Sequence, residues 1–156
     1  MTFVQDFYPD SYAHCHGCGR HNAHGLHIRT EWIGGEGVCH FTPWPEHIAV
    51  PGFVYGGLTA CLVDCHSIAT AAAAAMTADG LVPCRDETPR FVTGSLQVDY
   101  LKPTPMGVEL VLRSRATDIG PRKVTVETRV MAGDVEVARG RTLAVRLPTT
   151  MASPST

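Results

Sequence analysis

Asp64 is the residue whose type and surroundings most clearly indicate chemistry. It is the only carboxylate between Glu46 and Asp79, and it lies within an apolar stretch that has helical spacing. An ionised carboxylate in such a helix costs several kcal/mol of desolvation unless it faces a pocket or a partner. The position therefore indicates a carboxylate that faces a pocket or a partner. The alternative is a structural carboxylate at a solvent-facing helix edge, or one that caps a neighbouring loop.

Two glycines, Gly56 and Gly57, begin the same stretch directly after Tyr55. The free N–H groups and the positive dipole end of such a helix start form a candidate oxyanion hole or anion site. The alternative is a glycine pair that only allows close packing. Asp64 lies roughly 10 Å beyond Gly57 along the helix axis, too far to act on a carbonyl held at that helix start. We therefore expect the second half of the site to come from another subunit's helix.

One helix and six strands are predicted to position these residues. Apolar residues recur at helical spacing from Gly56 to about Ala78, and Gly80 is a natural stop. Alternating apolar residues and turn signals predict strands over Leu26–Trp32, Gly37–Thr42, Phe91–Leu101, Val108–Thr117, Lys123–Met131 and Val135–Leu147. Because the helix is apolar on nearly all sides, we expect an α+β domain whose antiparallel sheet of five to six strands curls around it.

The composition indicates one domain with a packed core. The 156 residues are 44% hydrophobic and 18% charged, and the formal net charge is −2. This balance excludes the strongly basic character typical of nucleic-acid-binding domains. We expect a loop segment over 1–24, the domain over 25–147 and a flexible tail over 148–156. No segment approaches the roughly 20 apolar residues of a membrane span, and the first residues lack the features of a signal peptide.

Cys15 and Cys18 form a C-x-x-C motif within a histidine-rich segment. Zinc binding and redox chemistry are two interpretations of this motif. No second C-x-x-C or spaced histidine pair completes a standard zinc module, however, and the βαβ context of a redox motif is absent. We interpret the motif as a structural loop and expect no metal. Without a secretory signal, the six cysteines indicate a reduced, cytoplasmic chain.

The order of these motifs resembles the hotdog-fold acyl-CoA thioesterases, specifically the phenylacetyl-CoA-thioesterase-like branch. In that branch a His-Gly-Gly motif begins the central helix, and an acidic residue follows seven positions after the second glycine. Gly56, Gly57 and Asp64 keep this spacing. The resemblance covers residues 15–147. It includes Cys15-x-x-Cys18-Gly19-x-x-Asn22-x-x-Gly25-Leu26, Tyr100-Leu101-Lys102-Pro103-Thr104-Pro105, and the Gly/Arg/Lys turn before the last hairpin.

The resemblance implies hydrolysis of a small or medium acyl-CoA to free acid and coenzyme A, with no other cofactor. It implies that Asp64 is the base or nucleophile, that the Gly57 N–H polarises the carbonyl, and that Thr93 orients the attacking water. It also implies a homodimer or a dimer of dimers. The expected substrate-binding residues are Tyr55, Gly56, His47, Ser67, Arg122 and Lys123, the last two as contacts to coenzyme A phosphates.

Two positions depart from the family pattern. Tyr55 stands where the motif histidine is usual, and Ala49 stands where some members carry an asparagine. We expect His47 to compensate on the carbonyl-binding side. A non-catalytic acyl-CoA-binding hotdog protein and a hotdog dehydratase are the alternative functions.

Overall fold

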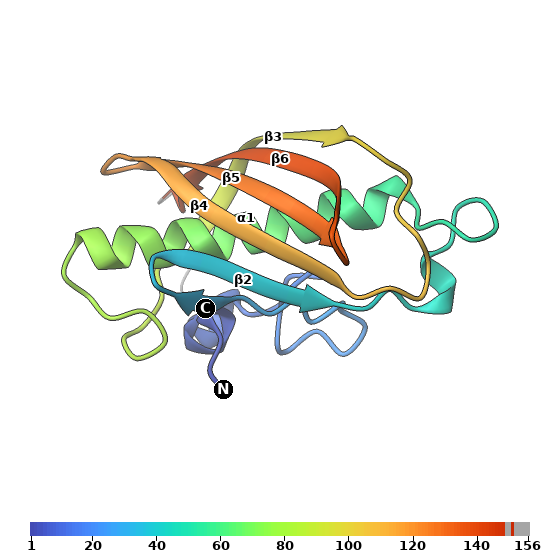
Figure 1. Ribbon diagram of the computed structural model, residues 1–156. Helices are drawn as coiled ribbons and strands as arrows, with labels where there is room; N and C mark the ends of the chain where they lie inside the picture. Colours follow the sequence, from blue (N-terminus) through green and yellow to red (C-terminus); the bar gives the residue numbers. More distant parts are fainter. Residues whose placement is uncertain (149–150, 152–156) are drawn as a thin grey trace.

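The fold is arranged around helix α1 (Gly56–Ala78), which lies across one face of a six-stranded sheet (Figure 1). The computed structural model describes residues 1–148 and 151, so most of the expected tail lies outside the described residues. The helix begins after Tyr55, whose backbone is extended, and ends just before Gly80, whose φ is +77°. Glycine adopts this φ without strain. The expected helix bounds are confirmed.

The sheet is antiparallel, with the strands in the spatial order β1-β2-β4-β5-β6-β3. The strands are β1 (Glu31–Ile33), β2 (Glu36–Phe41), β3 (Phe91–Tyr100), β4 (Leu110–Ile119), β5 (Lys123–Ala132) and β6 (Val135–Arg146). The predicted α+β class, with one long helix on an antiparallel sheet, is confirmed. Strand β3 lies at one edge of the sheet, and most of its residues are exposed whichever face they point to.

The first expected strand, Leu26–Trp32, is wrong over most of its length. Regular pairing with β2 is confined to Glu31–Ile33. Farther upstream, the Leu26 N–H donates to the His16 carbonyl at 2.8 Å, and the Ile28 N–H donates to the Gly17 carbonyl at 2.9 Å. The backbone of this segment therefore pairs with the N-terminal loop instead of the sheet.

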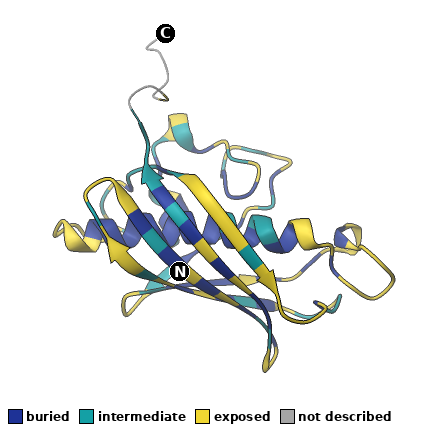
Figure 2. Ribbon diagram, turned by 90° about the horizontal axis from the view of Figure 1, so that it is seen from above, coloured by how far each residue is buried: buried dark blue, intermediate teal, exposed yellow. Residues whose placement is uncertain are grey.

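The helix is shielded on two sides, not by the sheet alone. Toward the sheet, Ile68 and Ala72 pack in a cluster with Phe91 and Val124. On another side, Val4 packs against Ala69 and Ala73. Val4 belongs to the short 3-10 helix η1 (Val4–Phe7), which is followed by η2 (Asp10–Tyr12). The N-terminal segment, expected to be a loop outside the domain, thus contributes to its core (Figures 1 and 2).

Helix α1 is long and apolar enough to cross a membrane by length and composition, contrary to the expectation that no segment reaches that size. The mean hydropathy of its 18-residue window is 1.4, and 83% of that window is buried inside the domain. A mostly buried core helix meets the same criterion. Figure 2 shows α1 dark blue along most of its length beneath the strands.

Three buried hydroxyl groups join the helix to the middle of the sheet. Ser67 Oγ lies 2.8 Å from Thr128 Oγ1, which lies 2.6 Å from Ser114 Oγ. All three side chains are buried. Because Thr128 is the central member, its hydroxyl satisfies both neighbours. We refer to Ser67, Thr128 and Ser114 as the hydroxyl chain.

Candidate active site

Asp64 lies on the face of α1 that meets edge strand β3, and it is hydrogen-bonded there to Thr93. The Thr93 hydroxyl donates to Asp64 Oδ1. The sheet register slips between Thr93 and Ser95, so Gly94 is an extra residue opposite β6. A bulge of this kind changes the direction of neighbouring side chains. The structure thus brings together the two residues that the sequence assigned to the carboxylate side of the site.

A cavity of about 180 Å³ lies beside this pair. Its walls include Asp64, Thr93 and Arg90, together with Cys15 and Cys18 from the N-terminal loop and Cys65 from the helix. Burial raises the pKa of the Asp64 carboxyl above its ordinary value, the Thr93 hydrogen bond opposes this, and the nearby Cys15 raises it further. Partial burial at a cavity wall explains how an apolar helix accommodates a carboxylate. Such a group can accept a proton from water or a ligand in the cavity.

The start of α1 forms a second group of candidate residues. Tyr100 Oη donates to the Gly56 carbonyl at 2.6 Å, which ties the start of the helix to the end of β3. The Tyr55 ring covers Gly57 so closely that a Cβ there would lie 2.5 Å from Tyr55 Cε2. Only glycine fits this position without displacing the ring. The N–H groups of a first helical turn have no acceptor within the helix, so they are available to a ligand.

His47 and Tyr55 are neighbours, as expected. Their ring centroids are 6.3 Å apart, and the Tyr55 N–H donates to the His47 carbonyl at 2.9 Å. His47 ends the 3-10 helix η3 (Pro45–His47) and is buried. Its Nδ1 accepts from the Trp44 N–H at 3.0 Å, and its ring stacks on Trp44. These contacts fix the imidazole beside the start of α1.

A larger cavity of about 550 Å³ lies next to this helix start. Phe53, Gly56, Tyr100 and Lys102 are among its lining residues. Apolar side chains are exposed around it, with Val50 62% and Tyr100 54% exposed. The cavity therefore combines apolar walls, free helix N–H groups and one cationic side chain.

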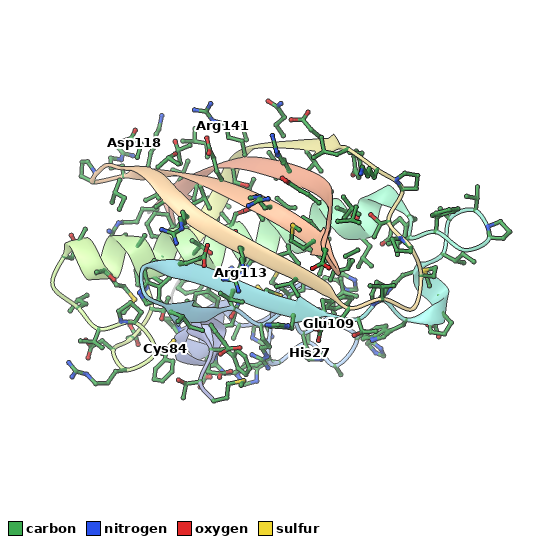
Figure 3. The ribbon with its side chains drawn as sticks, viewed as in Figure 1. His27, Cys84, Glu109, Arg113, Asp118 and Arg141 are labelled. Atoms are coloured by element: carbon green, nitrogen blue, oxygen red, sulfur yellow. The ribbon has the colours of Figure 1, made fainter. Side chains whose placement is uncertain are left out.

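Three expected binding residues lie elsewhere. The buried Ser67 belongs to the hydroxyl chain and does not line the Asp64 cavity. Arg122 and Lys123 are exposed at the β4–β5 turn, at the end of the sheet where Figure 3 labels Asp118. Residues 119–121 of this turn line a cavity with the C-terminal end of α1. Within one chain, the two basic residues are thus at the opposite end of the helix from Gly57.

Arg90 and the convergence of cysteines are features of the Asp64 cavity that the sequence did not predict. Arg90 precedes β3, and its guanidinium carbon lies 4.2 Å from the centroid of the Tyr8 ring. Cys65 faces Cys15 from the helix, with the two Sγ atoms 3.8 Å apart. The signals in the sequence were the Cys15-x-x-Cys18 motif and the four-residue spacing of Cys61 and Cys65, which places the latter two on one helix face.

Comparisons with known proteins agree with this arrangement. The family model of the thioesterase superfamily matches residues 51–139, which is more than half of the chain. A curated relative, the acyl-coenzyme A thioesterase THEM4 of Xenopus laevis, is 31% identical over 97 residues. That match covers 62% of this chain but only 38% of the relative's length.

Solved structures give the same result. A thioesterase superfamily protein from Shewanella loihica PV-4 is 42% identical, covers 89% of this chain and 98% of its own, and has a TM-score of 0.68. The protein smu.793 from Streptococcus mutans UA159, solved bound to acetyl CoA, is 18% identical and shares the fold, with a TM-score of 0.63 over 77% of this chain and 88% of its own. The family predicted from the motifs is therefore confirmed: the chain belongs to the thioesterase superfamily.

Proposed function

We propose that the chain hydrolyses the thioester of a small or medium acyl-CoA. The observation that carries this proposal is the Asp64 carboxylate, held by Thr93 on the wall of a cavity in an otherwise apolar helix. Membership of the thioesterase superfamily supports the reaction class. Similarity to the acyl-coenzyme A thioesterase THEM4 of Xenopus laevis supports an acyl-CoA as the substrate.

Asp64 acts as the general base in the route that the geometry favours. The Thr93 hydroxyl gives its hydrogen to Asp64 Oδ1 and keeps oxygen lone pairs that can accept a hydrogen bond from water. Asp64 takes one proton from this water, and the water oxygen bonds to the thioester carbonyl carbon. The carbon–sulfur bond then breaks, and the coenzyme A thiolate takes the proton from Asp64. Direct attack by Asp64, followed by hydrolysis of the resulting anhydride, is the alternative route.

The Gly57 N–H binds the oxyanion formed in this reaction, with Tyr55, Gly56 and His47 shaping the carbonyl site. Gly57 and Asp64 are roughly 10 Å apart along one helix, so Gly57 of one chain serves Asp64 of another. The exposed edge strand β3 beside Asp64 and the apolar side chains around the start of α1 support this arrangement. We therefore propose a homodimer or a dimer of dimers as the active form.

Coenzyme A phosphates are contacted by Arg122 and Lys123 in this proposal. Because these residues lie far from Gly57 in their own chain, they reach a ligand at that helix start only from a neighbouring chain. Lys102, which lines the cavity at the start of α1, is the cation nearest to that cavity in the same chain. No further cofactor is required for this chemistry.

Thiol release from a panel of acyl-CoAs tests the proposal. We expect the wild-type protein to hydrolyse at least one of them, and Asp64→Asn to lower kcat by about 10²- to 10⁴-fold because it removes the base. Asp134→Asn changes an exposed carboxylate in the β5–β6 turn and is the matched control. Near-normal turnover in Asp64→Asn would remove Asp64 from the mechanism. Thermal stabilisation by acyl-CoAs without turnover across the panel would favour the non-catalytic binding protein instead.

A further inference from the structure

Three cysteine sulfurs from two distant segments meet beside α1. The Sγ atoms of Cys15, Cys18 and Cys65 all lie within 4.8 Å of one another, and those of Cys15 and Cys65 are 3.8 Å apart. In a tetrahedral zinc site each Zn–S bond is about 2.3 Å, which places the sulfurs about 3.8 Å from each other. The spacing of the thiols is therefore close to that of a zinc–thiolate centre. We propose that Cys15, Cys18 and Cys65 bind one zinc ion, with Cys61 as the fourth ligand.

Cys61 completes the set because it stands one helical turn before Cys65 on the same face. Both sulfurs face the backbone between Cys15 and Cys18. A Cβ placed on Gly17 would lie 2.3 Å from Cys65 Sγ and 3.3 Å from Cys61 Sγ. The sequence therefore supplies a C-x-x-C from the loop and a C-x-x-x-C from the helix. Cys15, Cys18 and Cys65 are already grouped in the fold. With Cys61 as the fourth ligand, the two motifs would complete the zinc module that neither provides alone.

The loop that presents Cys15 and Cys18 is held in place by backbone bonds. The Gly19 N–H donates to the Cys15 carbonyl at 2.7 Å and closes the turn that contains both cysteines. A Cβ on Gly19 would lie 2.4 Å from the Cys15 backbone nitrogen, so this turn needs glycine. Because these backbone bonds fix the loop on their own, little ordering is required when a metal binds.

The cavity beside the cluster holds the Arg90 cation as well as the Asp64 carboxylate. Zinc with four thiolates carries a net charge of −2 and needs nearby positive charge when it is partly buried. Arg90 lines the same cavity as the three cysteines, and its buried Nη1 has no hydrogen-bond partner among the described residues. Arg90 also forms no ion pair with a carboxylate in the described part of the chain. Its charge is thus available to the thiolates.

The proposed ion has a structural consequence for the site. Cys65 follows Asp64 directly in α1, and both residues line the same cavity. Zinc would join the N-terminal loop to the helix at this point and fix the cavity wall that carries Asp64. Its role would be to hold this wall, since four thiolates leave no open position for substrate.

Zinc titration of the reduced full-length chain tests the proposal without reference to activity. After removal of metal by a chelator under reducing conditions, we expect the protein to take up one zinc ion per chain in competition with a chromophoric chelator. Cobalt in place of zinc should give the charge-transfer and d–d absorption of a tetrahedral thiolate complex. Zinc should also raise Tm, because the ion binds the folded chain preferentially.

Serine variants assign the ligands. We expect Cys15→Ser, Cys18→Ser and Cys65→Ser to lose stoichiometric zinc. Cys61→Ser should weaken binding by about tenfold or more, because loss of a mere hydrogen-bond partner of a ligand already costs about that much. Cys84→Ser is the matched control and should keep one zinc ion. Cys84, labelled in Figure 3, packs against the cluster of Val4, Ala69 and Ala73 and is not one of the grouped cysteines.

Two results would overturn the proposal. One is wild-type protein that is folded and fully reduced yet binds less than about one zinc ion per ten chains under these conditions. The other is a Cys15–Cys65 or Cys15–Cys18 disulfide in freshly purified protein that binds no zinc after reduction. Unchanged zinc affinity in Cys61→Ser would overturn the assignment of Cys61 as the fourth ligand.

Discussion

Replacing Thr93 by valine removes the hydroxyl that bonds to Asp64 and keeps the branched shape of the side chain. Thr93 is exposed on the edge strand β3, so the substitution leaves no buried group unsatisfied in the core. Valine is also a favourable residue in a strand. We therefore expect Thr93→Val to fold normally and to affect catalysis through the position of Asp64 and its water.

The magnitude follows from the type of hydrogen bond. A bond to a charged group contributes about 1.5–3 kcal/mol, and because each 1.36 kcal/mol is a factor of ten in rate, kcat should fall by about 10- to 150-fold. KM should change little, because Thr93 contacts the base and the water and not the body of the substrate. Thr93→Ser keeps the hydroxyl and should restore most of kcat.

Steady-state acyl-CoA hydrolysis provides the measurement, with the same comparison in an Asp64→Asn background. If the two residues act as a unit, Thr93→Val should cost much less in that background. A Thr93→Val enzyme with kcat within about twofold of wild type would show that Thr93 does not position the reacting groups. A large rise in KM at constant kcat would assign it to substrate binding instead.

Two further predictions concern stability. Thr128→Val removes the central member of the hydroxyl chain and leaves two buried hydroxyls without their partner. It should therefore lower the free energy of unfolding by about 2 kcal/mol or more. An unchanged midpoint in urea denaturation would contradict this. Glu136 accepts hydrogen bonds from Arg139 and Arg129, which lower its pKa from 4.5 to about 2. Since the folded-state pKa is lowered, this carboxylate stabilises the fold above pH 4.5 and the stabilisation is lost as pH falls from 4.5 toward 2. Glu136→Gln should therefore lower Tm at pH 7, and its Tm should approach that of the wild-type protein as pH falls through this acidic range. A Tm difference that is independent of pH would refute the ionic explanation.

The central helix and most of the sheet could be predicted from the sequence because their signals are local. Alanine-rich helical spacing and Gly80 determine where α1 lies, and alternating apolar residues mark β2, β4, β5 and β6. The strand expected over Leu26–Trp32 was wrong because the N-terminal loop, and not the sheet, pairs with the backbone N–H groups of Leu26 and Ile28. That competition depends on tertiary contacts that no local pattern contains.

The candidate site was predictable in its parts but not in its assembly. Asp64 stood out as an isolated carboxylate in an apolar helix, and the structure places it against Thr93. The meeting of Cys15 and Cys18 with Cys65 could not be predicted, because spacing within each segment carries no information about the distance between segments. Ser67 was assigned to substrate, yet a small polar residue on a helix is equally suited to a buried hydrogen bond.

The pairing of β3 with β6 determines when the candidate site can form during synthesis of the chain. Thr93 is placed opposite Ala144 in this pairing. Strand β3 therefore cannot pair in the sheet until β6, the last strand, has left the ribosome. Until then, α1 and Asp64 are already made but lack the neighbour that orients the carboxylate. Long-range pairing of this kind is slow compared with helix formation. We therefore expect the helix to form early in folding and the hydrogen bond between Asp64 and Thr93 to form late.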